Sequence, residues 1–223
     1  MMNSVLVVAA HLDDETLGCG GSLLRHKALG ADIHWLLVTE PTSELGYGAQ
    51  RLEDRGEKLR QAGEMYGFAS IHRLGFPAAR LDRMPQSDLV EAIAAVFADV
   101  RPSTVYLPFA HDVHTDHRIA FDAAYGAAKS FRAPYLKRML MMETVSETDF
   151  APPLRGETFA PNVFIDVTEH FDRKLEIMSV YSDELGAHPF PRSVEHLRAL
   201  AVHRGAAAGC SLAEAFVLLK EIV

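Results

Sequence analysis

The sequence predicts an α/β protein of the Rossmann-like, doubly wound type, a single domain with a mostly parallel sheet and helices on both of its faces. Apolar runs of strand length alternate along the chain with segments whose apolar residues recur at helical spacing. The strand-length runs are apolar on both faces, which is typical of strands buried within a parallel sheet. The chain has 223 residues, 48% of them hydrophobic and 23% charged, which is sufficient for one substantial core.

Residues 1–130 carry the regular alternation and are expected to form the α/β core. Ser87 is the expected cap of the third helix, and Pro102 prevents that helix from continuing. The expected elements are strand 5–10, a helix around 23–29, strand 33–39, helix 50–66, strand 71–74, helix 89–97 and strand 104–107. In such a sheet, ligands bind beyond the carboxyl ends of the strands.

Residues 131–223 are less regular and are expected to complete the same domain and its pocket. The expected elements are strands 138–143 and 163–167, a helix from a cap at Thr168 to about 181, a loop at 186–191, and a helix from Ser193 to 208 that Gly209 ends. Ser211 and Glu214 have the spacing of a capping box, which predicts a last helix. No internal repeat or linker interrupts the sequence, so residues 1–223 are expected to form one domain.

Charge and composition exclude several classes of protein. The 22 basic and 30 acidic residues give a formal net charge of −8, which argues against a nucleic-acid partner. With 11 His and only 2 Cys, the chain fits neither a disulfide scaffold nor a thiolate zinc module. No run approaches the roughly 18 apolar residues of a membrane span, and the first residues lack the pattern of a signal peptide. A cytoplasmic location without a membrane span is therefore expected.

Two clusters of His and acidic residues each follow a predicted strand. Residues 11–15 read His-Leu-Asp-Asp-Glu, and residues 111–117 contain three His and two Asp. Because the carboxyl ends of parallel strands share one edge of a sheet, the clusters are expected to meet there. Adjacent acids repel one another, and a divalent cation relieves that repulsion. A plainer interpretation, in which Asp13 and Asp14 only cap a helix, accounts for the first cluster but not for the second.

Imidazole and carboxylate ligands suit zinc, and iron, cobalt or nickel would accept the same set. A catalytic zinc takes three protein ligands and leaves one position for water. The two clusters contain more candidates than three ligands require. A surplus Asp and a surplus His are therefore available as general base and oxyanion stabiliser, the roles that metal-assisted hydrolysis of an amide needs.

The two clusters resemble the motifs of the LmbE-like or PIG-L family of zinc-dependent de-N-acetylases. The family motifs are Ala-His-Pro-Asp-Asp-Glu and Asp-x-His-Pro-Asp-His, and residues 10–15 and 112–117 are similar to them in the same order. The resemblance implies a metal-dependent hydrolase that removes an acetyl group from a small-molecule substrate, an N-acetylglucosamine-type amino sugar or its conjugate. It also implies one Zn²⁺ per chain and leaves a homo-oligomer open, because family members often assemble in that way.

Carried over by position, the resemblance implies which residues form the metal site. His11, Asp14 and His117 are implied to bind zinc. Glu15 and Asp112 also match the motifs, and we expect them to support the His ligands from behind.

The resemblance also implies the residues that act on the substrate. Asp13 is implied to be the general base. His114, oriented by Asp116, is implied to stabilise the tetrahedral oxyanion and to help the amine to leave. Arg55 falls at the substrate-binding arginine of the family, and its alternative interpretation is a solvated charge on a helix.

The sequence departs from the family pattern at three positions. Leu12 and Thr115 replace the proline of each motif, and Ala78 stands where relatives have an acid that contacts substrate hydroxyls. Residues 188–192 are interpreted as a connector, with a place at the rim of the pocket as the alternative, and His111 has no assigned role. The contrasting hypothesis for the whole chain is a non-catalytic α/β module that binds a sugar or nucleotide in the same metal-containing pocket.

Overall fold

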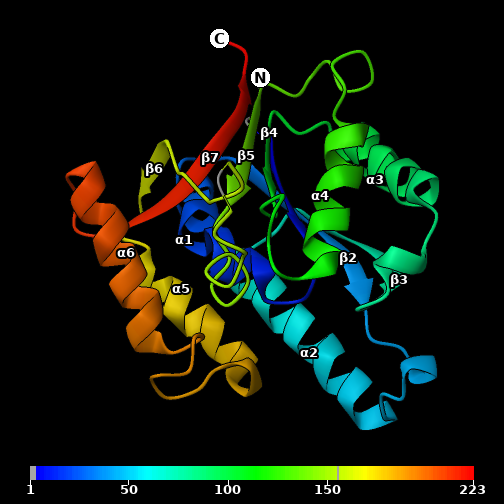
Figure 1. Cartoon of the computed structure of the whole chain (residues 1–223), viewed down its shortest axis with the longest axis horizontal. Coiled ribbons are helices and arrows are strands. Elements are labelled where there is room, and N and C mark those ends of the chain that lie inside the picture. The colour runs from blue at the N-terminus through cyan, green and yellow to red at the C-terminus, as the bar shows by residue number, and fades with distance from the viewer. Residues whose placement is uncertain (1–3, 155) are drawn as a thin grey trace.

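The fold is built on one seven-stranded sheet with helices packed on both faces (Figure 1). The computed structural model describes residues 4–154 and 156–223. The strands are β1 (Ser4–Ala9), β2 (Asp32–Glu40), β3 (Ser70–Pro77), β4 (Thr104–Leu107), β5 (Arg138–Met142), β6 (Val163–Asp166) and β7 (Ala213–Glu221). The helices are α1 (Asp14–Ala28), α2 (Ala49–Tyr66), α3 (Gln86–Val100), α4 (Thr115–Ala127), α5 (Phe171–Met178) and α6 (Val194–Ala208). The predicted doubly wound α/β class is confirmed.

The order of strands in the sheet, β3-β2-β1-β4-β5-β7-β6, places β1 between β2 and β4. The first five strands in that order are parallel, whereas β7 runs antiparallel to both of its neighbours. The chain therefore winds outward from β1 in one direction and then returns to add β4 on the other side. Such a reversal opens a crevice beyond the carboxyl ends of the two central strands. Both polar clusters follow these two strands.

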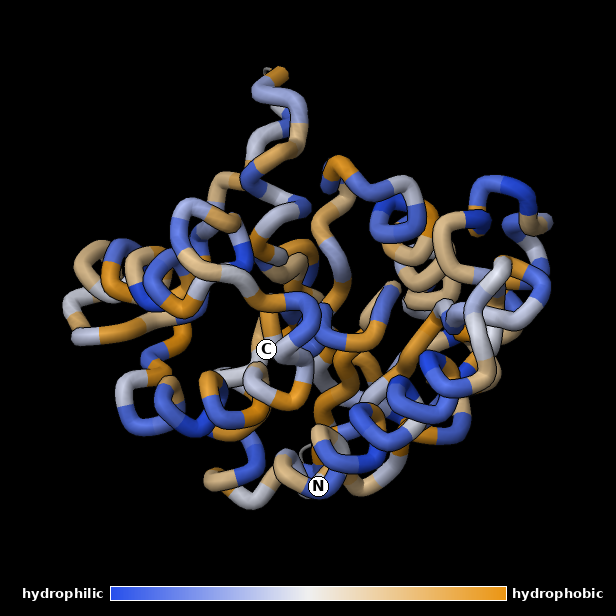
Figure 2. The backbone as a smooth tube through the Cα atoms, turned by 90° about the horizontal axis from the view of Figure 1, so that it is seen from below, coloured by the Kyte–Doolittle hydropathy of each residue, from blue (hydrophilic) through white to orange (hydrophobic). Residues whose placement is uncertain are grey.

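Strand β1 separates two apolar layers, because alternate side chains along a strand face opposite sides of the sheet. Val5, Val7 and Ala9 pack in the layer that α1, α2, α5 and α6 cover, whereas Leu6 and Val8 pack in the layer under α3 and α4. All five side chains are fully buried. In Figure 2, orange segments are concentrated near the centre of the molecule and blue segments lie mostly toward the outside. Burial on both faces explains the unbroken apolar run of this strand.

The glycine-rich sequence at 18–21 lies inside α1 and allows that helix to pack closely against its neighbours. A Cβ atom on Gly18 would lie 2.6 Å from Sδ of Met142, and one on Gly21 would lie 2.8 Å from the Val167 side chain. These distances are shorter than any ordinary carbon contact. Close packing of α1 therefore accounts for the glycines.

The helix predicted after Ser211 is wrong, because the chain there forms strand β7. This strand pairs with β5 on one side and β6 on the other, and sheet pairing with burial outweighs the local capping pattern. The carboxylate of Glu214 accepts hydrogen bonds from the backbone N–H groups of Gly21 and Ser22, at 2.8 and 2.7 Å, and from Nζ of Lys174 at 2.7 Å. Glu214 therefore ties β7 to α1 and α5 and caps no helix.

Two predicted helix caps are also wrong. Helix α3 begins directly after Pro85, so Ser87 lies inside the helix. Helix α5 begins after His170, and the hydroxyl of Thr168 instead donates a hydrogen bond to Oδ1 of Asp166 at 2.6 Å. Helix α3 therefore begins one residue before its expected cap, and α5 begins three residues after its expected cap.

Helix α6 agrees with the prediction at both ends. The Ser193 hydroxyl accepts the backbone N–H of His196 at 3.1 Å, and Gly209 ends the helix with a φ of 76°. The loop before α6 follows a short 3-10 turn, η3 (Ser179–Glu184). Within residues 4–154 and 156–223, no helix combines the length and apolarity needed to cross a membrane.

Candidate active site

Three ligand-type atoms converge beyond the carboxyl ends of β1 and β4. Nε2 of His117 lies 3.2 Å from Oδ2 of Asp14 and 3.3 Å from Nδ1 of His11. The same Asp14 oxygen lies 3.8 Å from Nδ1 of His11. His11 lies in the turn after β1, Asp14 begins α1, and His117 lies in the first turn of α4. The three side chains expected to bind zinc therefore meet at one point, which we call the metal group.

Each His of the metal group is held by a carboxylate at its other ring nitrogen. Nδ1 of His117 donates to Oδ2 of Asp112 at 2.8 Å, and Nε2 of His11 donates to Oδ2 of Asp116 at 3.0 Å. Because an ionised carboxylate only accepts hydrogen bonds, these contacts fix the tautomer of each ring. The two remaining ring nitrogens then present lone pairs to each other and to Asp14.

The metal group favours a positive charge at the point where its three atoms meet. Burial lowers the pKa of His117, but the carboxylates of Asp14 and Asp112 outweigh burial and raise this pKa well above its ordinary value. Burial raises the pKa of Asp14, but His117 and His11 outweigh it and lower this pKa. Two imidazole nitrogens and one carboxylate oxygen, with a carboxylate behind each His, form a donor set typical of zinc sites. The residues present fit a divalent metal such as zinc.

Asp13 stands between His11 and Asp14 in the sequence, and its backbone conformation is strained. Its φ of 113° falls in the left-handed region, which favours glycine. The Asp13 backbone N–H donates to Oε2 of Glu15 at 3.0 Å. The hydroxyls of Thr16 and Tyr181 donate to Oε1 of Glu15 at 2.5 and 2.9 Å. Glu15 therefore supports the strained turn at Asp13, and not a His ligand as the sequence led us to expect.

The Asp13 carboxylate is almost fully buried beside the metal group. Burial raises the pKa of Asp13 well above its ordinary value, the Arg192 guanidinium partly offsets this rise, and Asp14 and Glu15 add to it. Nη1 of Arg192 donates to Oδ2 of Asp13 at 2.8 Å. A raised pKa makes a carboxylate a stronger base, which suits a group that takes a proton from water.

His114 caps α4 and presents a neutral ring. Its Nδ1 accepts the backbone N–H of Asp116 at 3.1 Å, which leaves Nε2 as the nitrogen that carries a proton. Burial, together with the nearby His11 and His117, lowers the pKa of His114 to about 4. Asp116 contacts His114 through this backbone N–H and not through its carboxylate. The Asp116 carboxylate instead accepts hydrogen bonds from His11 at 3.0 Å and from the backbone N–H groups of Ala79 and Leu81 at 2.6 and 3.2 Å.

A cavity of about 200 Å³, which we call the first hollow, adjoins the metal group. Asp13, His114 and Arg55 all line it. The residues expected to act as base, oxyanion stabiliser and substrate-binding arginine therefore share one space. Tyr47 and Arg51 line the same hollow, and the Arg51 guanidinium lies 4.9 Å from the centre of the Tyr47 ring.

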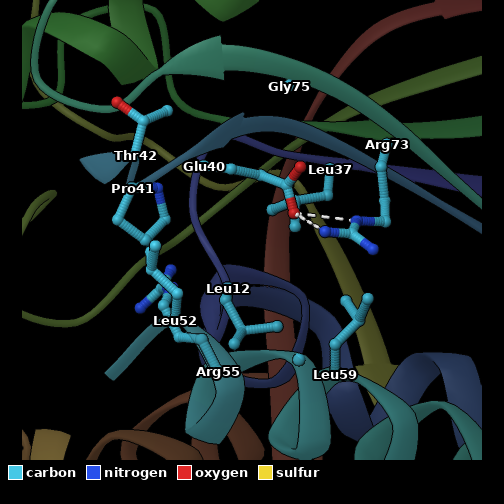
Figure 3. Close-up of a pocket in the computed structure, with 11 residues that line it drawn as sticks. Leu12, Leu37, Glu40, Pro41, Thr42, Leu52, Arg55, Leu59, Arg73 and Gly75 are labelled. Carbon is cyan, nitrogen blue, oxygen red and sulfur yellow. Dashed lines mark hydrogen bonds and ion pairs between the residues drawn. The ribbon is translucent and has the colours of Figure 1, made fainter. Parts of the chain in front are cut away.

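A second hollow of about 250 Å³ shares Leu12, Pro41 and Arg55 with the first (Figure 3). Four of its eleven lining residues are leucines, and an ion pair between Arg73 and Glu40, with a closest distance of 2.6 Å, lies among the lining side chains. Leu12 replaces the proline of the family motif and touches both hollows. The leucine at this position therefore forms part of the wall between the two hollows.

Three residues of the first hollow, Glu147, Glu184 and Arg192, come from residues 131–223, and the sequence assigned no site role to the first two. Arg192 belongs to the loop at 188–192, and it lines the hollow, in agreement with the alternative interpretation of this loop and not with that of a plain connector. No motif marks any of the three residues, and the only signal in the sequence is a basic residue at the end of a proline-rich loop. His111 packs against Phe109, with 5.5 Å between ring centroids, and is not part of the metal group.

The fold and the site together define a class of protein, a doubly wound α/β domain with a candidate site for a divalent metal at the switch point of its sheet. Residues 6–128 match the model of the PIG-L family, described as GlcNAc-PI de-N-acetylase. The match spans more than half of the chain and includes both clusters, and the chain belongs to this family. Arg192 and Glu147 lie outside the matched residues.

Similar proteins extend the likeness over nearly the whole chain. The diacetylchitobiose deacetylase of Thermococcus kodakarensis is 24% identical over 220 residues, which cover 96% of this chain and 82% of the relative. A probable N-acetyl-alpha-D-glucosaminyl L-malate deacetylase 2 of Bacillus cereus is 27% identical over 195 residues, 84% of this chain and 86% of the relative. Among solved structures, the conserved protein TT1542 from Thermus thermophilus has a TM-score of 0.80 at 27% identity, and the match covers 100% of this chain and 97% of that protein.

Proposed function

We propose that the chain is a zinc-dependent hydrolase that removes the acetyl group from an N-acetylglucosamine-type amino sugar or its conjugate. The observation that carries the proposal is the convergence of His11, Asp14 and His117 beside a hollow that Asp13 and His114 also line. Membership of the PIG-L family supports the reaction. The names of the two relatives support the substrate class, and because they name different conjugates the proposal covers the acetylated sugar and not the group attached to it.

The metal group would hold zinc through Nδ1 of His11, Oδ2 of Asp14 and Nε2 of His117. When bound, zinc supplies Lewis acidity, which lowers the pKa of water and polarises a carbonyl group. Asp112 and Asp116 hold the two rings in the orientation that keeps these nitrogens directed at Asp14.

Asp13 is the proposed general base. Its carboxylate, with a pKa raised by burial, takes a proton from the water whose oxygen attacks the acetyl carbonyl carbon. The C–N bond then breaks, and the proton passes to the departing nitrogen. The products are acetate and the free amine, so water and amide are consumed one for one.

His114 is the proposed stabiliser of the negative charge that develops on the carbonyl oxygen. With a pKa of about 4, its ring is neutral at neutral pH, and the proton on Nε2 is available to donate a hydrogen bond. Arg55, on the side of the first hollow formed by α2, is proposed to bind the sugar. Its guanidinium offers several donors to hydroxyl oxygens.

Release of free amine from a panel of N-acetylglucosamine derivatives tests the proposal. The protein is stripped with a chelator, reloaded with zinc and assayed in both states, with bound zinc measured in parallel. We expect amine from at least one derivative only in the zinc-loaded state. If zinc is bound and no derivative yields amine, the non-catalytic module that binds a sugar or nucleotide is the better account.

A further inference from the structure

Arg192 reaches the first hollow from the far end of the chain and contacts the Asp13 carboxylate. It lies directly before the cap of α6, 179 residues from Asp13 in sequence. Its Nη1 donates to Oδ2 of Asp13 at 2.8 Å, and the Arg192 side chain is 16% exposed. The two residues therefore form a largely buried ion pair inside the proposed active site.

The Arg192 guanidinium is itself held by three residues besides Asp13. Nε donates to the hydroxyl of Ser146 at 2.7 Å, and Nη2 donates to Oε1 of Glu147 at 3.2 Å. Nη1 also lies 3.4 Å from Oε2 of Glu184. Contacts to both Nη atoms and to Nε fix the plane of the guanidinium, because its donors have a rigid forked geometry. Two chain segments outside the PIG-L match, one with Ser146 and Glu147 and one with Glu184, therefore set the place of this one group.

The two carboxylate oxygens of Asp13 differ in their hydrogen bonds. Oδ2 is taken by Arg192, whereas no residue in the described part of the chain donates a hydrogen bond to Oδ1. The strained backbone at Asp13 does not by itself fix the rotation of the Asp13 side chain.

We propose that Arg192 is a positioning residue that fixes the orientation of the Asp13 carboxylate, so that Oδ1 is the oxygen that accepts the proton. The inference rests on the proposed function, in which Asp13 is the general base. A base misplaced by about 1 Å costs up to about 100-fold in rate. Arg192 acts through Asp13, so its loss changes the rate of the chemical step and leaves substrate and zinc binding unchanged.

A second half-buried arginine provides a matched control. Arg204, on α6, donates to both oxygens of Glu143 at 3.0 and 2.6 Å, and its side chain is 18% exposed. This pair resembles the Arg192 pair in burial and charge but does not contact Asp13 or the metal group. Arg204→Met therefore reports what the loss of a buried arginine does to folding alone.

The test compares kcat, KM, bound zinc and thermal unfolding of the zinc-loaded wild-type chain with those of Arg192→Met, Arg192→Lys and Arg204→Met. For Arg192→Met we expect kcat to fall by about 30- to 100-fold, with KM and zinc content unchanged. We expect Arg192→Lys to lie between wild type and Arg192→Met, because lysine keeps the charge but not the fork. Arg204→Met should retain the wild-type kcat.

Three results from these measurements overturn the inference. The first is a kcat of Arg192→Met within about 3-fold of wild type. The second is a rise in the KM of this variant at constant kcat, which marks a substrate contact. The third is a loss of bound zinc from the variant. A wild-type chain that releases no amine overturns the proposed function instead. Crystal structures of wild type and Arg192→Met then decide the inference without activity. A rotated Asp13 carboxylate supports it, and an unchanged carboxylate overturns it.

Discussion

Oδ2 of Asp112 lies 2.8 Å from Nδ1 of His117, and both side chains are completely buried. The hydroxyl of Thr148 donates to the other oxygen of Asp112 at 2.7 Å, so the carboxylate cannot rotate freely. The contact holds the imidazole with Nε2 toward Asp14. A residue that touches none of the other metal-group atoms thus controls the direction of one proposed ligand.

The Asp112 contact predicts a loss of metal affinity when the carboxylate is removed. For Asp112→Ala we expect zinc affinity to fall by about 10- to 100-fold, because the His117 ring loses its tautomer and orientation. His111→Ala, in the same loop but packed against Phe109, should keep the wild-type affinity. Competition with a chromogenic zinc chelator measures both. Equal affinities for the two variants would show that Asp112 has no part in the metal site.

Arg55 predicts a defect in substrate binding. For Arg55→Met we expect kcat/KM to fall by about 10- to 100-fold, the equivalent of losing a hydrogen bond from a charged group, while bound zinc is retained. Arg60→Met is the control on the same helix, because Arg60 pairs with Glu57 and Glu64 on the surface of α2 and does not line the first hollow. Steady-state kinetics on the best derivative of the panel measures both variants. If Arg55→Met keeps the wild-type kcat/KM, Arg55 is better interpreted as a solvated charge on a helix.

The buried pair of Lys174 and Glu214 predicts a large loss of stability. Lys174→Met leaves the Glu214 carboxylate buried without its cation, so the free energy of unfolding should fall by about 3–5 kcal/mol. Arg173→Met, next to it in sequence, removes an exposed pair with Glu176 and a 3.4 Å hydrogen bond to the Met65 carbonyl, and should cost less than about 1 kcal/mol. Urea denaturation of both variants measures the difference. Similar losses in the two variants would contradict a stabilising role for the buried Lys174–Glu214 pair.

His26 predicts a loss of stability at acidic pH. Burial, together with Arg25 and Arg138, lowers the pKa of His26 to about 4 from an ordinary value of 6.5. The unfolded chain therefore binds a proton more readily than the folded chain. The free energy of unfolding should fall as the pH drops from about 6.5 to about 4, and the contribution is fully present only above this range.

The comparison that isolates this contribution is wild type against His26→Gln. Chemical denaturation at about pH 7.5 and about pH 5 should show a smaller loss in the variant, because it lacks the group that takes up the proton. His203→Gln, on α6, is a control for the loss of one histidine. Equal losses for wild type and His26→Gln would rule out a depressed pKa at His26.

Much of the metal group was predictable because local patterns and fold topology agree there. Both clusters follow strands that are apolar on both faces, and parallel strands bring their carboxyl ends to one edge. His11 and Asp116, 105 residues apart in sequence, therefore meet at 3.0 Å. The details of the contact were not predictable, because whether Asp116 holds His11 or His114 depends on side-chain rotation.

The second half was harder to predict because tertiary contacts override local patterns there. Ser211 and Glu214 have a helix-capping pattern, but the carboxylate is used to bind α1 and the segment pairs as a strand. Arg192 has no motif, and its partners Asp13 and Glu147 lie far from it in sequence. Only the folded chain brings these groups together.

The most direct test of the central claim is amine release by zinc-loaded Asp13→Asn. Asparagine tolerates the positive φ at this position better than alanine and keeps the shape of the side chain, but it cannot accept the proton. We expect the variant to bind zinc as wild type does and to release amine at least about 100-fold more slowly. Wild-type rates from Asp13→Asn, or full activity of the zinc-free wild-type chain, would contradict a metal-dependent hydrolysis with Asp13 as its base.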